Sequence, residues 1–176
     1  MSMIPRGPVR SLLALVLGLA VGVGGYVLFS QLKGGVDFAT GHHMPGLELR
    51  SLEGESRSLA RLADDKPAVV AVFASWCRYC KPVMRSMITF QDLAAQEGVG
   101  VYAVNFGEKQ DVVRRTAASL GLEMPVFVDE GNDFAKAMGV NAIPVVFGVA
   151  QGGKIRYIDH ALPPEGKWRE FIDSLR

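Results

Sequence analysis

The sequence predicts an α/β domain in which helices flank a central mixed sheet, preceded by an N-terminal transmembrane helix. Two observations predict this architecture: residues 11–29 are almost wholly apolar, and beyond residue 46 short β-branched runs alternate with amphipathic stretches. Strands that alternate with helices form sheets that are covered on both faces. We therefore expect a cytoplasmic N-terminus at 1–10, a membrane anchor at 11–29, a linker at 30–45 and one domain at 46–176.

Five segments have the composition of strands. The clearest is PAVVAVFA at residues 67–74, a continuous apolar run expected of a strand that is buried on both faces. The others are residues 99–106, 124–128, 143–149 and 154–159. Gly152-Gly153 separates the last two segments, which predicts a hairpin.

Four further segments have apolar positions at helical spacing. They are residues 80–96, 110–120, 133–138 and 164–175. Gly98 and Gly121 stand where the first two helices should end. Asp133 or Asn132 is the expected N-terminal cap of the third helix. Because these helices alternate with the strands, we expect them to cover both faces of the sheet.

The N-terminal apolar segment predicts the compartment of the domain. Residues 11–29 contain no charged side chain, and as a helix they would be roughly 28 Å long, close to the hydrocarbon core of a bilayer. Arg6 and Arg10 precede the segment, so the positive-inside rule places residues 31–176 on the periplasmic side of the inner membrane. The alternative is a cleavable signal peptide, although this apolar run is longer than usual and no A-x-A motif ends it. Either segment would export the domain.

The charge balance argues against one large class of partners. The chain has 19 Lys and Arg against 18 Asp and Glu, a net charge of +1, and no run of like charge in its body. Proteins that bind nucleic acid usually have a basic face or a base-reading motif. No nucleic-acid partner is therefore expected.

The chain has two cysteines, Cys77 and Cys80, in one Cys-x-x-Cys motif. A bridge over so short a loop adds little stability, so the pair predicts thiol–disulfide exchange rather than a structural role. The motif follows a predicted buried strand and opens a predicted helix, whose free N–H groups and dipole lower a thiol pKa. Arg78 and Lys81 add positive charge nearby. We expect Cys77 to be the nucleophile and Cys80 to resolve the mixed disulfide.

Metal binding is the main alternative for such a pair. A zinc site needs a second pair of ligands, whereas His42 and His43 lie in the expected linker and His160 far along the chain. No metal site is therefore expected. A copper(I) metallochaperone remains open, because thiolates are soft ligands and the chain has seven methionines, although Met84 and Met87 have the spacing of core residues. A peroxidase is not favoured, because no cysteine stands in a Thr-x-x-Cys context.

Pro144 stands inside an apolar run, IPVVFGV, that otherwise predicts a central strand. Proline is rare in such strands because it donates no ladder hydrogen bond, so a bulge or an edge strand is one explanation. The functional interpretation is a cis-proline beside the dithiol, which leaves the backbone of Ile143 free to pair with an extended substrate. Trp76 is expected to cover one side of the site, so that Trp76, Ile143 and Pro144 contact the substrate.

These elements together resemble the thioredoxin superfamily. The resemblance rests on the buried strand, the WCRYCK segment at residues 76–81 and the apolar-Pro segment at residues 143–144. It implies a thioredoxin-like fold and a dithiol–disulfide oxidoreductase with no cofactor besides its own redox-active disulfide. Its substrates would be protein thiols and disulfides.

The similarity is closer to the membrane-anchored TlpA/ResA branch of that superfamily. PGLEL at residues 45–49, with Gly54 and Ser58-Leu59, resembles the N-terminal hairpin of the branch. YAVNFGE at residues 102–108 resembles its extra strand and the helical insertion that follows. The similarity covers about residues 45–176, and it implies an extracytoplasmic enzyme that usually works in the reductive direction, often for cytochrome c maturation.

Several positions depart from the family pattern. Ala71 stands where thioredoxins often have a buried acid, and Val83 where many TlpA/ResA members have a glutamate. Val145 follows the proline where many members have threonine, and Pro82 lies unusually early in the helix. Two carboxylates that would accept the proton of the second cysteine are therefore missing. Glu108 is the remaining candidate acceptor, with a solvent-exposed helix cap as its alternative role.

The direction of electron flow has two interpretations. Arg78 and Lys81 stabilise a thiolate and so the reduced form, which is a property of disulfide-forming oxidants. The resemblance implies a reductase that is re-reduced by a membrane protein relaying electrons across the bilayer. An anchor would suit this role, because it raises the effective concentration of the domain near that partner.

Overall fold

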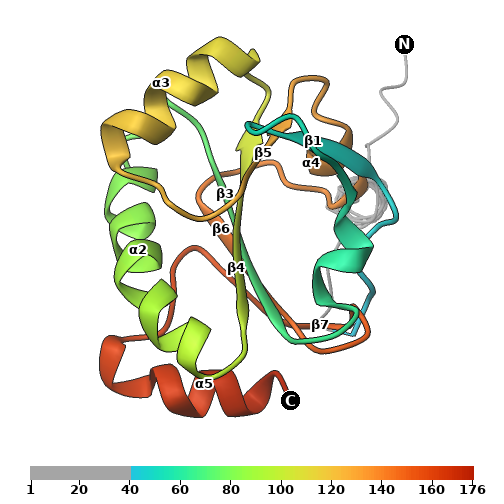
Figure 1. Cartoon of the computed structure of the whole chain (residues 1–176), viewed down its shortest axis with the longest axis vertical. Coiled ribbons are helices and arrows are strands. Elements are labelled where there is room, and N and C mark those ends of the chain that lie inside the picture. Colours follow the sequence, from blue (N-terminus) through green and yellow to red (C-terminus); the bar gives the residue numbers. More distant parts are fainter. Residues whose placement is uncertain (1–40) are drawn as a thin grey trace, which may run out of the picture. The chain divides into compact units, whose positions relative to one another are not determined.

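The computed structural model describes residues 41–176 of the chain (Figure 1). The predicted cytoplasmic segment at 1–10, the predicted anchor at 11–29 and most of the predicted linker lie outside the described residues. Within residues 41–176, no helix has both the length and the apolar character that a membrane span requires.

Within the described residues, seven strands form a single sheet. They are β1 Glu48–Ser51, β2 Ser56–Ser58, β3 Ala68–Phe73, β4 Gly100–Phe106, β5 Val126–Asp129, β6 Val145–Val149 and β7 Ile155–Asp159. Their order across the sheet is β2-β1-β5-β4-β3-β6-β7. β3, β4 and β5 are parallel, whereas the remaining pairings are antiparallel. The predicted mixed sheet is confirmed, with β3 in its interior between β4 and β6.

The helices follow the predicted segments closely. They are α2 Cys80–Gln96, α3 Gln110–Leu120, α4 Asp133–Ala137 and α5 Trp168–Ser174, together with the 3-10 turns η1 Leu59–Ala63 and η2 Glu165–Lys167. The bounds of α2 and α3 are those that the sequence predicts. The last predicted helix, at 164–175, forms its first turn as η2, and η1 is an element that the sequence did not predict.

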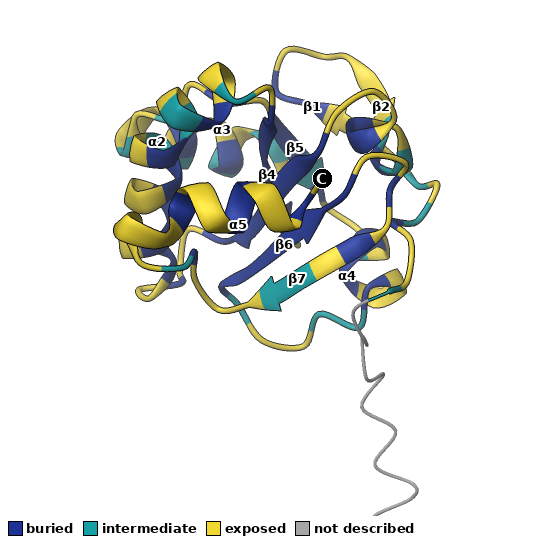
Figure 2. Cartoon of the chain, turned by 90° about the horizontal axis from the view of Figure 1, so that it is seen from below, coloured by how far each residue is buried: buried dark blue, intermediate teal, exposed yellow. Residues whose placement is uncertain are grey.

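The helices lie on both faces of the sheet, as expected (Figures 1 and 2). β3 shows how the core divides, because alternate side chains of a strand point to opposite faces. Val69, Ala71 and Phe73 belong to the core beneath α2, α3 and α5. Val70 and Val72 belong to the core beneath η1 and α4. Every residue of β3 is buried, as expected of a strand covered on both faces.

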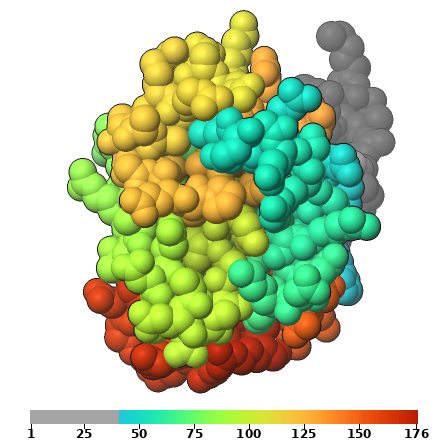
Figure 3. Space-filling model, viewed as in Figure 1, coloured from blue at the N-terminus to red at the C-terminus, as the bar shows by residue number. Residues whose placement is uncertain are grey.

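The C-terminal helix α5, red in Figure 3, lies beneath the green segment of α2. Trp168 of α5 packs edge-on against Phe90 of α2, with ring centroids 5.3 Å apart. Phe171 packs against Tyr157 of β7 at 4.9 Å. A Cβ atom on Gly148 of β6 would lie 2.8 Å from the Leu175 side chain, so glycine at this position permits the close approach of the helix to the sheet.

The start of α4 differs from the sequence prediction in its chemistry. Asn132 occupies the predicted cap position in a left-handed conformation (φ 57°), but its side chain makes no cap hydrogen bond. The buried carboxylate of Asp129 accepts the N–H groups of Phe134 at 3.2 Å and Ala135 at 3.0 Å instead. The acceptor for the free N–H groups in the first turn of α4 is therefore a carboxylate at the end of β5.

The chain joins the sheet before the predicted start of the domain at residue 46. The Gly41 N–H donates to the Ile155 carbonyl at 2.7 Å, and the Ile155 N–H donates to the His42 carbonyl at 2.7 Å. The Met44 N–H donates to the Gly153 carbonyl at 2.9 Å, and the Met44 side chain is buried. Residues 41–44, predicted to belong to a linker, are thus attached to the start of β7.

Candidate active site at the dithiol

The two cysteines lie where β3 leads into α2. β3 ends at Phe73, residues 74–79 form a turn, and α2 begins at Cys80; we call residues 74–79 the cysteine turn. Cys77 and Cys80 are joined by a disulfide and are both buried. Within the turn, the Cys77 N–H donates to the Ala74 carbonyl at 3.2 Å. The predicted position between a buried strand and an amphipathic helix is confirmed.

The first turn of α2 is directed at the sulfur of Cys77. The backbone N–H of Cys80 lies 3.1 Å from Cys77 Sγ, and the two atoms form a hydrogen bond. In the reduced protein, this N–H and the helix dipole favour the thiolate of Cys77 over its thiol. A nucleophilic cysteine needs such groups beside its sulfur, because they stabilise the charged form.

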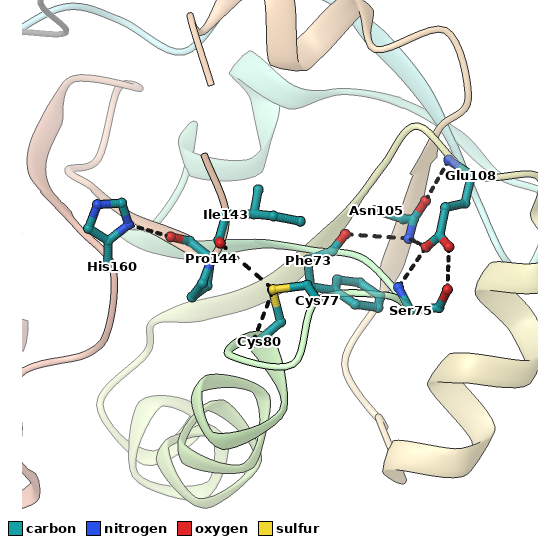
Figure 4. The surroundings of a disulfide bond; sticks show 9 residues. All are labelled: Phe73, Ser75, Cys77, Cys80, Asn105, Glu108, Ile143, Pro144 and His160. Atoms are coloured by element: carbon teal, nitrogen blue, oxygen red, sulfur yellow. Dashed lines mark hydrogen bonds between the residues drawn. A yellow bond between two sulfur atoms is a disulfide. The ribbon is translucent and has the colours of Figure 1, made fainter. Parts of the chain in front are cut away.

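The Ile143–Pro144 peptide bond is cis and lies directly against the dithiol (Figure 4). The Ile143 carbonyl oxygen is 3.7 Å from Cys77 Sγ. Pro144 precedes β6, which lies between β3 and β7 and is irregular only near Gly148 and Val149. The alternatives of an edge strand or a bulge at Pro144 are therefore wrong, and the predicted cis-proline is confirmed.

The segment before the proline has a backbone donor without a partner in the part of the chain that the structure describes. We call residues 141–144 the proline loop. Ile143 is half-buried, and among the described residues its N–H makes no hydrogen bond. Its carbonyl faces the sulfur of Cys77. An extended polypeptide laid beside this residue would find a free donor in the Ile143 N–H, which strand addition requires.

Glu108 is held by groups on the cysteine turn and on β4. Its carboxylate accepts the Ser75 N–H at 2.8 Å, the Ser75 hydroxyl, and the Asn105 side-chain amide at 2.7 Å. Asn105, which is fully buried, also accepts the Glu108 N–H at 3.1 Å and donates to the Phe73 carbonyl at 3.4 Å. Figure 4 shows this group on the side of Cys77 away from Pro144. Glu108 thus fixes the cysteine turn at its first residues.

The sequence suggested two roles for Glu108, a proton acceptor for Cys80 and a helix cap. α3 begins at Gln110 with Lys109 as its cap residue, so Glu108 is not the helix cap. Among the described residues, no hydrogen bond joins Glu108 to either cysteine. The role of Glu108 as proton acceptor stays a prediction. The sequence did not predict the contact between Glu108 and Ser75.

Two aromatic side chains stand out beside the dithiol. Trp76 is 65% exposed and Tyr79 is 62% exposed, whereas the cysteines next to them are buried. Trp76 rests edge-on against Phe106 at a centroid distance of 6.2 Å. Arg78 donates to the Tyr79 hydroxyl at 2.7 Å and lies 4.6 Å from the centroid of its ring. Exposed aromatic surface beside buried sulfurs suits the binding of a polypeptide.

The two predicted basic residues are on the surface. Arg78 and Lys81 are both exposed. The guanidinium of Arg78 contacts both the hydroxyl and the ring of Tyr79. Lys81 lies in the first turn of α2, one residue after Cys80. Their predicted effect on the thiol pKa stays a prediction.

His160 lies at the site, although its sequence position suggested no role beyond a metal ligand. Its Nδ1 lies 2.6 Å from the Pro144 carbonyl oxygen, so Nδ1 must carry the proton, because a carbonyl only accepts. Val146 pairs with Asp159 across the β6–β7 hairpin. Counting back from the predicted Gly152-Gly153 turn would therefore have placed His160 near Pro144. Among the described residues, no group of three or more His, Cys, Asp or Glu side chains could hold a metal ion.

The chain is similar to several known proteins. The family model described as AhpC/TSA family matches residues 40–158. The thiol-disulfide oxidoreductase ResA of Geobacillus thermodenitrificans is 28% identical, over 95% of this chain and 94% of that protein. The protein of the same name from Bacillus subtilis is 26% identical, over 96% of this chain and 92% of its own length.

Solved structures show the same fold. A putative thiol:disulfide interchange protein DsbE from Chlorobium tepidum superposes with a TM-score of 0.69 at 22% identity, covering 78% of this chain and 99% of that one. The thioredoxin domain of a thiol-disulfide oxidoreductase from Bacteroides vulgatus also gives 0.69, at 16% identity, covering 80% of this chain and 100% of that one. The fold is thioredoxin-like.

Proposed function

Because this chain belongs to the AhpC/TSA family and has a thioredoxin-like fold, we propose that it is a thiol–disulfide oxidoreductase of the ResA type that reduces specific protein disulfides. The observation on which the proposal rests is the position of Cys77. Its sulfur accepts the first N–H of α2 and lies 3.7 Å from the carbonyl before the cis-proline. These contacts supply a stabilised thiolate on one side and a backbone for the substrate on the other.

The reaction has two exchange steps. In the reduced enzyme, the Cys77 thiolate attacks one sulfur of a substrate disulfide, and the other substrate sulfur leaves as a thiolate and is protonated. Cys80 then loses its proton and attacks Cys77 Sγ in the mixed disulfide, which releases the second substrate thiol. Two electrons pass to the substrate, and the Cys77–Cys80 disulfide forms, as in this structure.

The surroundings of the sulfur favour protein substrates. Trp76 and Tyr79 expose most of their surface beside the dithiol, and Ile143 leaves its N–H free among the described residues. A small disulfide would use none of these groups. A polypeptide could pair with Ile143 and cover the aromatic rings, so Trp76, Ile143 and Pro144 are its proposed contacts.

The proposed location is the periplasmic side of the inner membrane, with residues 11–29 as an uncleaved anchor and residues 1–10 in the cytoplasm. Support comes from the apolar segment and its preceding arginines. The match to the Geobacillus protein spans 95% of the chain and must therefore include almost all of residues 11–29. The proposed role is of the cytochrome c maturation type, with a membrane protein that relays electrons to Cys77–Cys80.

The oxidising direction is the second candidate, because the N–H of Cys80 on Cys77 Sγ and the nearby Arg78 and Lys81 all favour the reduced form. Stabilisation of the reduced form raises the reduction potential. Equilibration of the full-length chain with glutathione distinguishes the two directions. A potential near about −120 mV indicates an oxidant, and one below about −250 mV indicates a reductase.

The chemistry itself is tested by trapping. In the Cys80→Ser variant, Cys77 can attack but nothing resolves the product, so a mixed disulfide should accumulate with glutathione disulfide and with proteins of native membranes. The matched Cys77→Ser variant should accumulate none, because Cys80 is assigned the resolving role and not the attack on the substrate. If both variants trap equally, the assigned roles are wrong, and if neither traps, the proposed function is wrong.

A further inference from the structure

A hollow of about 170 Å³ lies beside the proline loop. Its floor is made by Met138, Val145 and Phe147, which are buried in the part of the core beneath η1 and α4. Asn141 and His160 stand at its rim and are exposed. The hollow is therefore an apolar depression with a polar edge, of a size suited to a single aliphatic side chain.

The hollow and the dithiol lie on two sides of the same two residues. Ala142 and Val145, which flank Ile143–Pro144 in the chain, both line the hollow. The Ile143 carbonyl faces Cys77 Sγ at 3.7 Å, and the Pro144 carbonyl accepts from His160 at 2.6 Å. Figure 4 shows Pro144 between His160 and the cysteines. The hollow thus lies next to the proposed substrate contact, on the side of the proline loop away from the cysteines.

An extended substrate would connect the two places. A strand advances about 3.3 Å per residue and sends alternate side chains to opposite faces. A polypeptide that pairs with the free N–H of Ile143 while its cysteine reaches Cys77 passes Pro144 within two or three residues. One of its side chains then lies over the hollow, where Met138, Val145 and Phe147 offer an apolar surface.

We propose that this hollow is a specificity subsite, which receives an aliphatic side chain of valine or leucine size located two or three residues from the substrate cysteine. The inference rests on the proposed function, and it narrows the substrate to an extended polypeptide segment with an apolar residue near its disulfide. Small disulfides, which have no residue to place there, gain nothing from the hollow.

The test uses the reduced full-length chain and a set of peptides. Each peptide has one cysteine, held as a mixed disulfide with glutathione, in an otherwise glycine- and serine-based sequence. A leucine is placed in turn at each of the three positions before and after the cysteine. Burial of a leucine side chain should raise the second-order rate constant about tenfold at one of these positions, relative to glycine.

Two variants connect the preference to the hollow. Ala142→Phe places a ring at the exposed rim, and the leucine-to-glycine rate ratio should fall to about one, because burial of the leucine is blocked. Val140→Ala enlarges the hollow, whose lining includes Val140, and should move the preference from leucine to phenylalanine. Ala118→Phe makes the same change as the first variant at an exposed position of α3, and should leave the ratio unchanged.

The failure of the subsite and the failure of the proposed function give different results. If the peptides react through Cys77 but leucine has no effect at any position, or its effect survives Ala142→Phe, the subsite is wrong and the oxidoreductase stands. If no mixed disulfide reacts with Cys77, both proposals fall. A second copy of the chain covering the hollow would also overturn the subsite, and would appear as a dimer that Ala142→Phe dissociates.

Discussion

The cysteine turn and the proline loop meet at the same sulfur but are held in different ways. The cysteine turn is tied to Glu108 through both the N–H and the hydroxyl of Ser75, and Glu108 is itself held by the buried Asn105. The proline loop is held by the exposed His160, which donates to the Pro144 carbonyl, and by the long contact of the Ile143 carbonyl with Cys77 Sγ. The reactive sulfurs are therefore fixed before a substrate binds, while the backbone opposite them stays available to pair with it.

The largest loss of unfolding free energy is expected for Asn105→Ala, which removes the support of the cysteine turn. Within the described residues, the side chain of the buried Asn105 makes three hydrogen bonds, with Glu108 N–H, Glu108 Oε2 and the Phe73 carbonyl. Its removal leaves buried groups unsatisfied and should lower the free energy of unfolding by about 2–3 kcal/mol. Urea denaturation of the oxidised chain measures this change.

A matched control lies in the proline loop. Asn141 is exposed, and its side chain makes no hydrogen bond within the described residues. Asn141→Ala should therefore change the free energy of unfolding by less than about 0.5 kcal/mol. Equal losses in the two variants would contradict the contrast between the regions.

An intermediate effect is expected for His160→Ala. This change removes the hydrogen bond to the Pro144 carbonyl at an exposed position, where water can replace the donor. The free energy of unfolding should fall by about 0.5–1 kcal/mol, at most half of the Asn105→Ala effect. A loss as large as that of Asn105→Ala in the same urea assay would mean that the proline loop is held as firmly as the cysteine turn.

The smallest effect concerns Tyr157, whose hydroxyl donates to the Ala161 carbonyl at 2.7 Å beside His160. Burial, with a further contribution from Asp159, raises the pKa of Tyr157 to about 12 from the ordinary value of 10.0. Since the unfolded chain releases this proton first, the stabilising effect is complete below about pH 10 and is lost as the pH rises toward about 12. The loss should be small, because the half-exposed hydroxyl is screened by water.

Tyr157→Phe should remove that alkaline component. The fall in unfolding free energy between about pH 9 and about pH 11.5 should be smaller in the variant than in the parent chain, as measured by urea titrations at both values. Identical pH dependences would show that the Tyr157 proton does not contribute to the free energy of unfolding.

The predictable parts of the molecule are those with strong local patterns. β3 was predictable because a run without polar residues must be covered on both faces. α3 was predictable to its last residue because Gly121, at φ 69°, forms its left-handed C-cap. The dithiol was predictable because a Cys-x-x-Cys pair requires a specific explanation. Pro144 was identified for the same reason, but its cis peptide bond comes from the structure and not from the sequence.

The remaining parts depend on contacts between distant residues. Ser75 and Glu108 are 33 positions apart, and nothing in either local sequence indicates the hydrogen bonds between them. Asp129 caps α4 from the preceding strand, whereas local propensity favoured the side chain of Asn132 or Asp133. His160 approaches Pro144 only because the β6–β7 hairpin brings them together. In each case tertiary structure decides which polar group finds which partner.

The pairing of residues 41–42 with Ile155 has a consequence for self-association. β7 is an edge strand, and edge strands with open N–H and C=O groups promote pairing between copies. Both backbone groups of Ile155 are occupied by Gly41 and His42, while the opposite edge, β2, is only three residues long. A shortened chain that started at residue 46 would uncover the β7 edge and should aggregate more readily than one that retains Gly41.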